Sequence, residues 1–145
     1  MARTAADIMD RDFSFVDCDT TVAEAEEYFQ RDGVTALPVL NPDRTVFGLL
    51  TPKNLAQFHQ RPLNNPRAFH AWEICDTRPP QAAPAMALAD LVVAVLEAPA
   101  REVLIVNDEQ QLVGVISTDR LIRTNLVEGA PLEPFAGTAI PPDQG

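Results

Sequence analysis

Apolar and polar positions follow a helical pattern in the early part of the chain. Apolar residues recur at helical spacing from Val22 to Phe29, and the capping-box sequence Thr21-Val22-Ala23-Glu24 marks where the spacing begins. Gly33 is a residue of the kind that ends helices. The pattern therefore predicts a helix of about three turns that begins at residue 22.

The pattern then changes to one that is typical of strands. Apolar runs at 37–40 and 46–50 are separated by the polar stretch 41–44, which predicts a β-hairpin. Thr51 followed by Pro52 is a helix N-cap followed by proline at the first helical position. A second helix is therefore expected at about residues 52–60.

The same order of elements returns 66 residues later. The stretch LPVLNPDRTVFGLLT at 37–51 aligns without a gap with VLIVNDEQQLVGVIS at 103–117, although few letters are identical. An internal repeat of this kind is a stronger signal than either copy alone. The second copy predicts a helix at about 87–97, strands near 102–107 and 112–116, and a helix capped by Ser117 that closes at Gly129.

Short extended pieces at 14–16 and 80–83 precede the first helix of each copy, so each copy has the order β-α-β-β-α. We therefore expect a mixed α/β (α+β) fold made of two repeats. The predicted units are repeat 1 with the start of the linker at 1–66, repeat 2 at 67–129, and a flexible proline-rich tail at 130–145.

Composition restricts the classes of function. The chain has 145 residues and a formal net charge of -10, and this charge argues against a nucleic-acid surface. No stretch reaches the roughly 18 to 20 continuous apolar residues of a membrane helix, and the N-terminal sequence MARTAADIMD does not have the layout of a signal peptide. We therefore expect a cytoplasmic protein that binds neither nucleic acid nor a membrane.

Chemistry-bearing residues are few. The two cysteines, Cys18 and Cys75, do not form a disulfide scaffold or a CxxC motif, and His59 and His70 have no clustered partners that would make a metal site. The sequence contains no catalytic triad order, no P-loop and no HExxH motif. The sequence therefore predicts a protein that is not an enzyme, with no metal site and no obligatory cofactor.

The repeated motifs resemble the CBS domain. The resemblance rests on the β-α-β-β-α order and on four short segments: Ala6-Asp7-Ile8-Met9, Leu37-Pro38-Val39-Leu40, Gly48-Leu49-Leu50-Thr51 and Gly114-Val115-Ile116-Ser117. Two such repeats resemble a Bateman module. The resemblance implies that the repeats pack with pseudo-twofold symmetry and that clefts between them bind adenosyl compounds such as AMP, ADP or ATP.

The residues themselves support a binding cleft. A serine or threonine at a helix N-cap, with free backbone N–H groups behind it, is a ready site for an anion or a ribose. Thr51 and Ser117 fit this description, and the alternative is that each is only an N-cap.

The chain departs from the nucleotide-binding pattern of the family, GxxTxxD, in both copies. The aspartate position holds Asn54 in the first copy and Arg120 in the second, and Arg101 is the cation that stands before a second strand. An anionic ligand is expected at Thr51, Lys53 and Asn54, assisted by Arg101. The full set of candidate ligand-binding residues is Thr51, Lys53, Asn54, Pro38, Met9, Arg101, Ser117 and Arg120.

The helix LADLVVAVLE at 88–97 carries charge only at Asp90 and Glu97, so its apolar residues cover most of its circumference. A second copy of the chain would cover the other face, because symmetric homodimers are the commonest oligomers. The alternative is burial between the two repeats. The candidate interface residues are Leu88, Leu91, Val92 and Val95.

These observations predict a stand-alone CBS-pair regulatory module. It would sense a small ligand, an adenine nucleotide or another adenosyl compound, and modulate a partner protein whose identity the sequence does not give. The alternative is a ligand-independent dimeric scaffold with degenerate clefts, which the two missing ribose aspartates favour.

Overall fold

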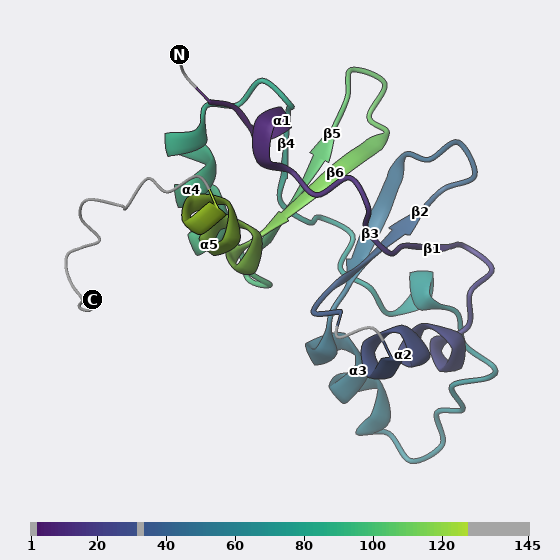
Figure 1. The fold of residues 1–145 in the computed structure, drawn as a ribbon. Coiled ribbons are helices and arrows are strands. Elements are labelled where there is room, and N and C mark those ends of the chain that lie inside the picture. Colours follow the sequence, from purple (N-terminus) through teal and green to yellow (C-terminus); the bar gives the residue numbers. More distant parts are fainter. Residues whose placement is uncertain (1–2, 32–33, 128–145) are drawn as a thin grey trace, which may run out of the picture.

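Two three-stranded sheets form the centre of the structure, a computed structural model that describes residues 3–31 and 34–127 (Figure 1). The first sheet has the order β1-β2-β3 and the second the order β4-β5-β6. In each sheet the first strand is parallel to the second, and the second is antiparallel to the third. The strands are β1 (Val16–Asp17), β2 (Leu37–Leu40), β3 (Val46–Leu50), β4 (Gln81–Ala82), β5 (Glu102–Val106) and β6 (Leu112–Ser117).

The helices follow the same order in both halves of the chain. The helices α2 (Val22–Arg31) and α3 (Pro52–His59) belong to the first half, and α4 (Leu88–Glu97) and α5 (Thr118–Val127) to the second. Two short helices, α1 (Ala5–Ile8) and η1 (Ala71–Glu73), precede the first strand of each half. The predicted mixed α/β fold with two β-α-β-β-α units is therefore confirmed.

The short segments 4–10 and 70–76, which we call the exchanged segments, each pair with the sheet of the other half. Asp10 forms an antiparallel bridge with Val115 of β6, and Asp76 forms the equivalent bridge with Leu49 of β3. These two bridges are related by the 66-residue offset of the sequence repeat. The bridges Thr4–Ala87 and Thr21–His70 are related in the same way. The predicted pseudo-twofold arrangement is therefore confirmed.

Equivalent glycines make room for the exchanged segments. A Cβ on Gly48 would lie 2.5 Å from the backbone oxygen of Asp76 and 2.6 Å from the sulfur of Cys75. A Cβ on Gly114 would meet the side chain of Met9. Glycine at both positions thus lets the other half of the chain pack directly on the strand.

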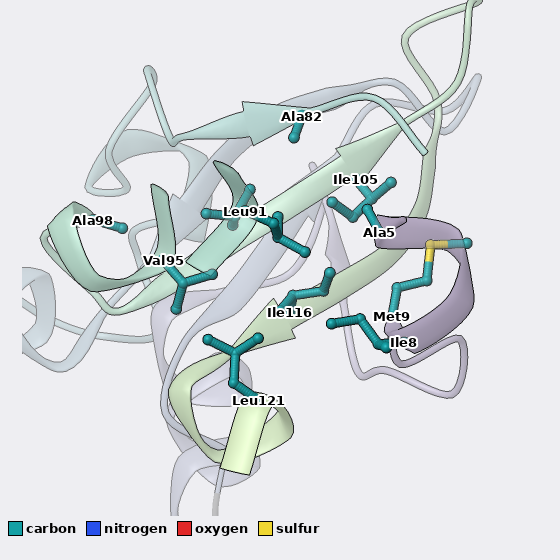
Figure 2. Packing of buried hydrophobic residues seen from close by; sticks show 11 residues of the cluster. Ala5, Ile8, Met9, Ala82, Leu91, Val95, Ala98, Ile105, Ile116 and Leu121 are labelled. Atoms are coloured by element: carbon teal, nitrogen blue, oxygen red, sulfur yellow. The ribbon is translucent and has the colours of Figure 1, made fainter. Parts of the chain in front are cut away.

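The core has three parts. One cluster lies between the two sheets and contains Leu40, Leu49, Leu104 and Val115. A second cluster packs in the first half, and a third packs in the second half. Figure 2 shows the third cluster, in which Ile8 of α1 lies among side chains from α4, β6 and α5. The two sheets therefore share one of the three clusters, which packs them against each other.

The apolar helix α4 requires a correction. Leu91 and Val95, two of the candidate interface residues, are fully buried in the core of their own half, and Leu88 and Val92 are partly buried against it. Leu91 and Val95 are therefore not available to a second copy of the chain. The exposed large apolar residues of α4 are Val93 and Leu96. The homodimer itself stays a prediction.

The predicted domain boundaries stay predictions. The predicted helix end at Gly129 and the predicted flexible tail at 130–145 lie outside the described residues. None of the described helices has the length and apolar character needed to cross a membrane.

Candidate functional site

A cavity of about 590 Å³, which we call the interrepeat cleft, opens between the two halves of the structure. Its walls come from four places: the segment after α1, the segment that leads into β2, the first residue of β5, and the end of β6 with the start of α5. Because both halves contribute, a molecule in this cavity would contact both at once.

The junction of β6 and α5 is built by local hydrogen bonds. The hydroxyl of Ser117 accepts a hydrogen bond from the backbone N–H of Arg120 at 3.2 Å, as expected for a residue that caps a helix. Ser117 is also the register partner of Glu102 across β5 and β6. The first residue of β5 and the start of α5 are thereby held at the same edge of the cleft.

Arg120 joins this edge to the first exchanged segment. Its Nε donates to the carbonyl oxygen of Ile8 at 2.7 Å, and its Nη2 donates to the carbonyl oxygen of Met9 at 3.4 Å. Arg120 also lines the cleft, so its guanidinium group is already hydrogen-bonded to the protein backbone there. Such bonds fix the position of α5 relative to the N-terminal segment.

Carboxylates dominate the charge of the cleft. Asp10, Asp12, Glu102 and Asp119 line it, together with Arg120 and Arg123. Asp119 forms an exposed ion pair with Arg123 at 2.9 Å. One oxygen of Asp10 accepts the backbone N–H of Asp12 at 3.0 Å. The surroundings of Glu102 are therefore negative.

Glu102 is the most unusual of these carboxylates. The residue is 7% exposed, and its Oε1 has no hydrogen-bond partner in the part of the chain that the structure describes. Burial, together with a smaller effect of the negative charge of Asp10, raises the pKa of the Glu102 carboxyl to about 7. A buried carboxylate without a partner is costly, so this group favours either a proton or a positively charged neighbour.

The equivalent junction in the first half is closed on itself. The backbone N–H of Thr51 donates to Oδ1 of Asn54 at 2.9 Å, and the hydroxyl of Thr51 accepts from the backbone N–H of Asn54 at 3.3 Å. Nδ2 of Asn54 donates to Asp76 at 3.4 Å. Thr51 and Asn54 are both buried, whereas Lys53 is exposed. The polar groups of this junction thus satisfy one another.

The structure divides the residues that the sequence analysis selected. It brings Pro38, Ser117 and Arg120 together at the interrepeat cleft. Met9 is 5% exposed and packs in the core of the second half. Arg101 is exposed and donates from its side chain to the carbonyl oxygen of Leu96.

Thr51, Lys53 and Asn54 do not line the interrepeat cleft. Asn54 instead lines a shallower hollow of about 400 Å³ beside α3, together with residues of the linker. The ligand-binding roles of all the selected residues stay predictions.

Sequence reasoning missed the acidic lining. Glu102 stands at the start of an apolar strand, at the position that Ala36 occupies in the first copy. A charged residue at the start of an apolar strand indicates a polar site, so the sequence alone could have identified Glu102. The positions of Asp10 and Asp12 depend on the exchange of segments between halves, which the local pattern does not show.

Residues 5–60 match the family described as CBS domain. None of the curated protein sequences compared with this chain matches it. The fold is similar to that of the CBS-pair protein CBSX2 from Arabidopsis thaliana, with a TM-score of 0.79 and 20% identity over 89% of this chain and 98% of that one.

Other solved structures agree with this similarity. A structure of CBSX2 in complex with AMP has a TM-score of 0.77 and 21% identity, and covers 88% of this chain and 98% of that one. The CBS domain pair of protein MJ0100, in complex with 5′-methylthioadenosine and S-adenosyl-L-methionine, has a TM-score of 0.71 and 15% identity, and covers 89% of this chain and 98% of that one.

The described chain therefore has the fold of a CBS pair. Its residues 5–60 match the CBS domain family, and its second half repeats the same order of strands and helices. The resemblance inferred from the sequence is confirmed.

Proposed function

We propose that this CBS pair is a regulatory module that binds a small adenosyl ligand in the interrepeat cleft and modulates a partner protein. The observation that carries the proposal is that both halves of the chain line a cavity of about 590 Å³. A ligand that touches both halves has different affinities for different arrangements of them. Binding would therefore shift the population toward one arrangement, which a partner can recognise.

The ligand class is supported by the similar structures. CBSX2 is in complex with AMP, and the MJ0100 pair is in complex with 5′-methylthioadenosine and S-adenosyl-L-methionine. All three molecules contain adenosine. The neutral polar groups of Ser14, Thr35 and Ser117, together with the ring of Phe13, give the interrepeat cleft partners for a ribose and a base.

A thermal-shift measurement with these three adenosyl compounds tests the proposal. A ligand present at about 100 times its dissociation constant stabilises the folded state by about 2.7 kcal/mol, so a clear and saturable shift is expected with at least one compound. Thr35→Trp should abolish the shift, because Thr35 is exposed and lines the cleft. Thr77→Trp is the matched control, since Thr77 is also exposed but does not line the cleft.

A ligand-independent interaction scaffold is the second candidate. The observation that favours it is the closed junction in the first half, where Thr51 and Asn54 are buried and bond to each other. If no adenosyl compound shifts the unfolding temperature at millimolar concentration, this candidate replaces the sensor.

We further propose that the chain is not catalytic. Two of the acidic residues in the interrepeat cleft already have partners, since Asp119 pairs with Arg123 and one oxygen of Asp10 accepts a backbone N–H. We therefore expect the acidic residues to select the ligand and not to take part in catalysis. Incubation of each bound compound with the protein should return it chemically unchanged.

A further inference from the structure

The charge of the interrepeat cleft is opposite to the charge of a phosphate. Four carboxylates line the cleft against two guanidinium groups. Arg120 bonds to two backbone carbonyls and Arg123 pairs with Asp119, so both guanidinium groups already have partners. A phosphate at this place would meet the excess negative charge of Asp10, Asp12 and Glu102.

Glu102 gives this acidic lining the properties of a built site. Glu102 lines the cleft and is 7% exposed, and its buried Oε1 has no hydrogen-bond partner among the described residues. Burying a carboxylate without a partner costs free energy even before a ligand binds. A ligand that supplies a positive charge or a hydrogen-bond donor to Glu102 would therefore bind favourably.

We propose that the interrepeat cleft selects a ligand that places a cationic group, an ammonium or a sulfonium, against Glu102, and that it discriminates against a phosphate at the same place. This inference rests on the proposed function, because it concerns the same cleft. It narrows the ligand class from adenosyl compounds in general to those with a positive charge.

The arrangement achieves selectivity in two ways. The carboxylate of Glu102 attracts the cation, and Asp10 and Asp12, which also line the cleft, repel an anion. Specific sites commonly combine an attractive and a repulsive element in this manner. The part of the ligand that carries no charge would lie against Phe13, Ser14 and Thr35.

Three adenosines that differ only at the 5′ position test the inference by calorimetric titration of the full chain. The probes are 5′-amino-5′-deoxyadenosine, which is cationic, 5′-methylthioadenosine, which is neutral, and AMP, which is anionic. We expect the cationic probe to bind at least about tenfold more tightly than AMP, with the neutral probe between them. S-adenosylmethionine is a fourth probe, in which a sulfonium carries the positive charge.

Glu102→Gln tests the role of the carboxylate, because glutamine keeps the shape and removes the charge. The variant should reduce the preference for the cationic probe over the neutral probe by about tenfold or more. Asp90→Asn, on the exposed face of α4, is the matched control and should leave the preference unchanged. The order in which the three probes bind to the wild-type protein tests the inference without any variant.

Each other result overturns the inference. If AMP binds as tightly as the cationic probe, the selectivity is wrong while the proposed function stands. If no probe binds at millimolar concentration, the inference and the proposed function both fail. If the cationic probe binds best but Glu102→Gln keeps the full preference, Glu102 is not the group that recognises it.

Discussion

Glu102 shows how one residue can set the character of a site. It stands at the first position of β5, where the equivalent residue of the other copy is Ala36. Both residues are buried and line the interrepeat cleft, but Ala36 places only a methyl group there, whereas Glu102 places a carboxyl. A carboxyl kept in such a place at some cost to stability is the kind of feature that serves function more than folding.

The raised pKa of Glu102 makes a prediction about stability. Its carboxyl has a pKa of about 7 in the folded chain, against 4.5 for an ordinary glutamate. Between these values the folded chain holds a proton that the unfolded chain has released, so the free energy of unfolding falls as the pH rises through this window. This group should account for a loss of up to about 3 kcal/mol that levels off above pH 7.

Urea unfolding of the wild type and of Glu102→Gln at pH 5 and at pH 8 measures this loss. The variant lacks the titrating group, so its stability relative to the wild type should increase toward pH 8. Asp90→Asn, at an exposed carboxyl of α4, is the control substitution. A difference between the wild type and Glu102→Gln that does not depend on pH would contradict the assignment.

The different surroundings of Gly48 and Gly114 predict different losses of stability when each glycine is replaced by alanine. Gly48→Ala would press a Cβ against the backbone oxygen of Asp76, which cannot move without shifting the chain, whereas Gly114→Ala would press it against the flexible side chain of Met9. We expect Gly48→Ala to lower the free energy of unfolding by about 3 kcal/mol and Gly114→Ala by about 1 kcal/mol. Urea unfolding of the two variants measures both, and equal losses would contradict the packing described for the exchanged segments.

At the scale of residues, the sequence predicted local chemistry well. Both N-caps, Thr51 and Ser117, accept the backbone N–H three residues later, because capping depends on neighbours in the chain. The burial of Glu102, and of Leu91 and Val95 on α4, depends on which other segments pack there. The alignment of the two copies identifies equivalent positions, but it does not show which segments of the other half pack against them.

At the level of helices and strands, each predicted element is found among the described residues. The first strand, predicted at 14–16, is shifted to Val16–Asp17, and the predicted end of the last helix at Gly129 lies outside the described residues. Periodicity, caps and turn residues are local signals, and they repeat in two copies that support each other. The exchange of segments 4–10 and 70–76 between the halves was not predicted. The choice of sheet depends on nonlocal contacts, such as the packing of Ile8 in the core of the second half.

The exchange can be tested by comparing Ile8→Ala with Ile74→Ala, the equivalent substitution in the other exchanged segment. Ile8 is 1% exposed, so its truncation should lower the free energy of unfolding by about 2–4 kcal/mol. Hydrogen exchange should show lost protection in α4 and β6 for Ile8→Ala, and in β2 and β3 for Ile74→Ala. The opposite distribution would contradict the exchange.

At the scale of the whole molecule, α4 and α5 lie side by side on one face of the second half (Figure 1). These two helices carry three large exposed apolar residues: Val93, Leu96 and Ile122. The apolar character of the helix predicted a homodimer through α4. Because Leu91 and Val95 are buried, we now propose that the exposed residues Val93, Leu96 and Ile122 form the dimer interface.

We expect light scattering after size-exclusion chromatography to give the mass of a dimer, and Val93→Asp to give that of a monomer. The unfolding midpoint of the variant monomer should change little, because Val93 is 53% exposed. Leu63→Asp is the matched control, since Leu63 is 93% exposed and lies in the linker. A wild type that is monomeric at all concentrations, or a Val93→Asp dimer, would contradict this interface.

We propose above that one small molecule binds at the interrepeat cleft and contacts both halves of this CBS-pair fold. The most direct measurement is a map of backbone amide NMR shifts during titration with S-adenosylmethionine. We expect saturable shifts in both halves, around Phe13 and Thr35 in the first half and around Glu102 and Ser117 in the second. Shifts confined to one half, or no shifts at millimolar ligand, would contradict it.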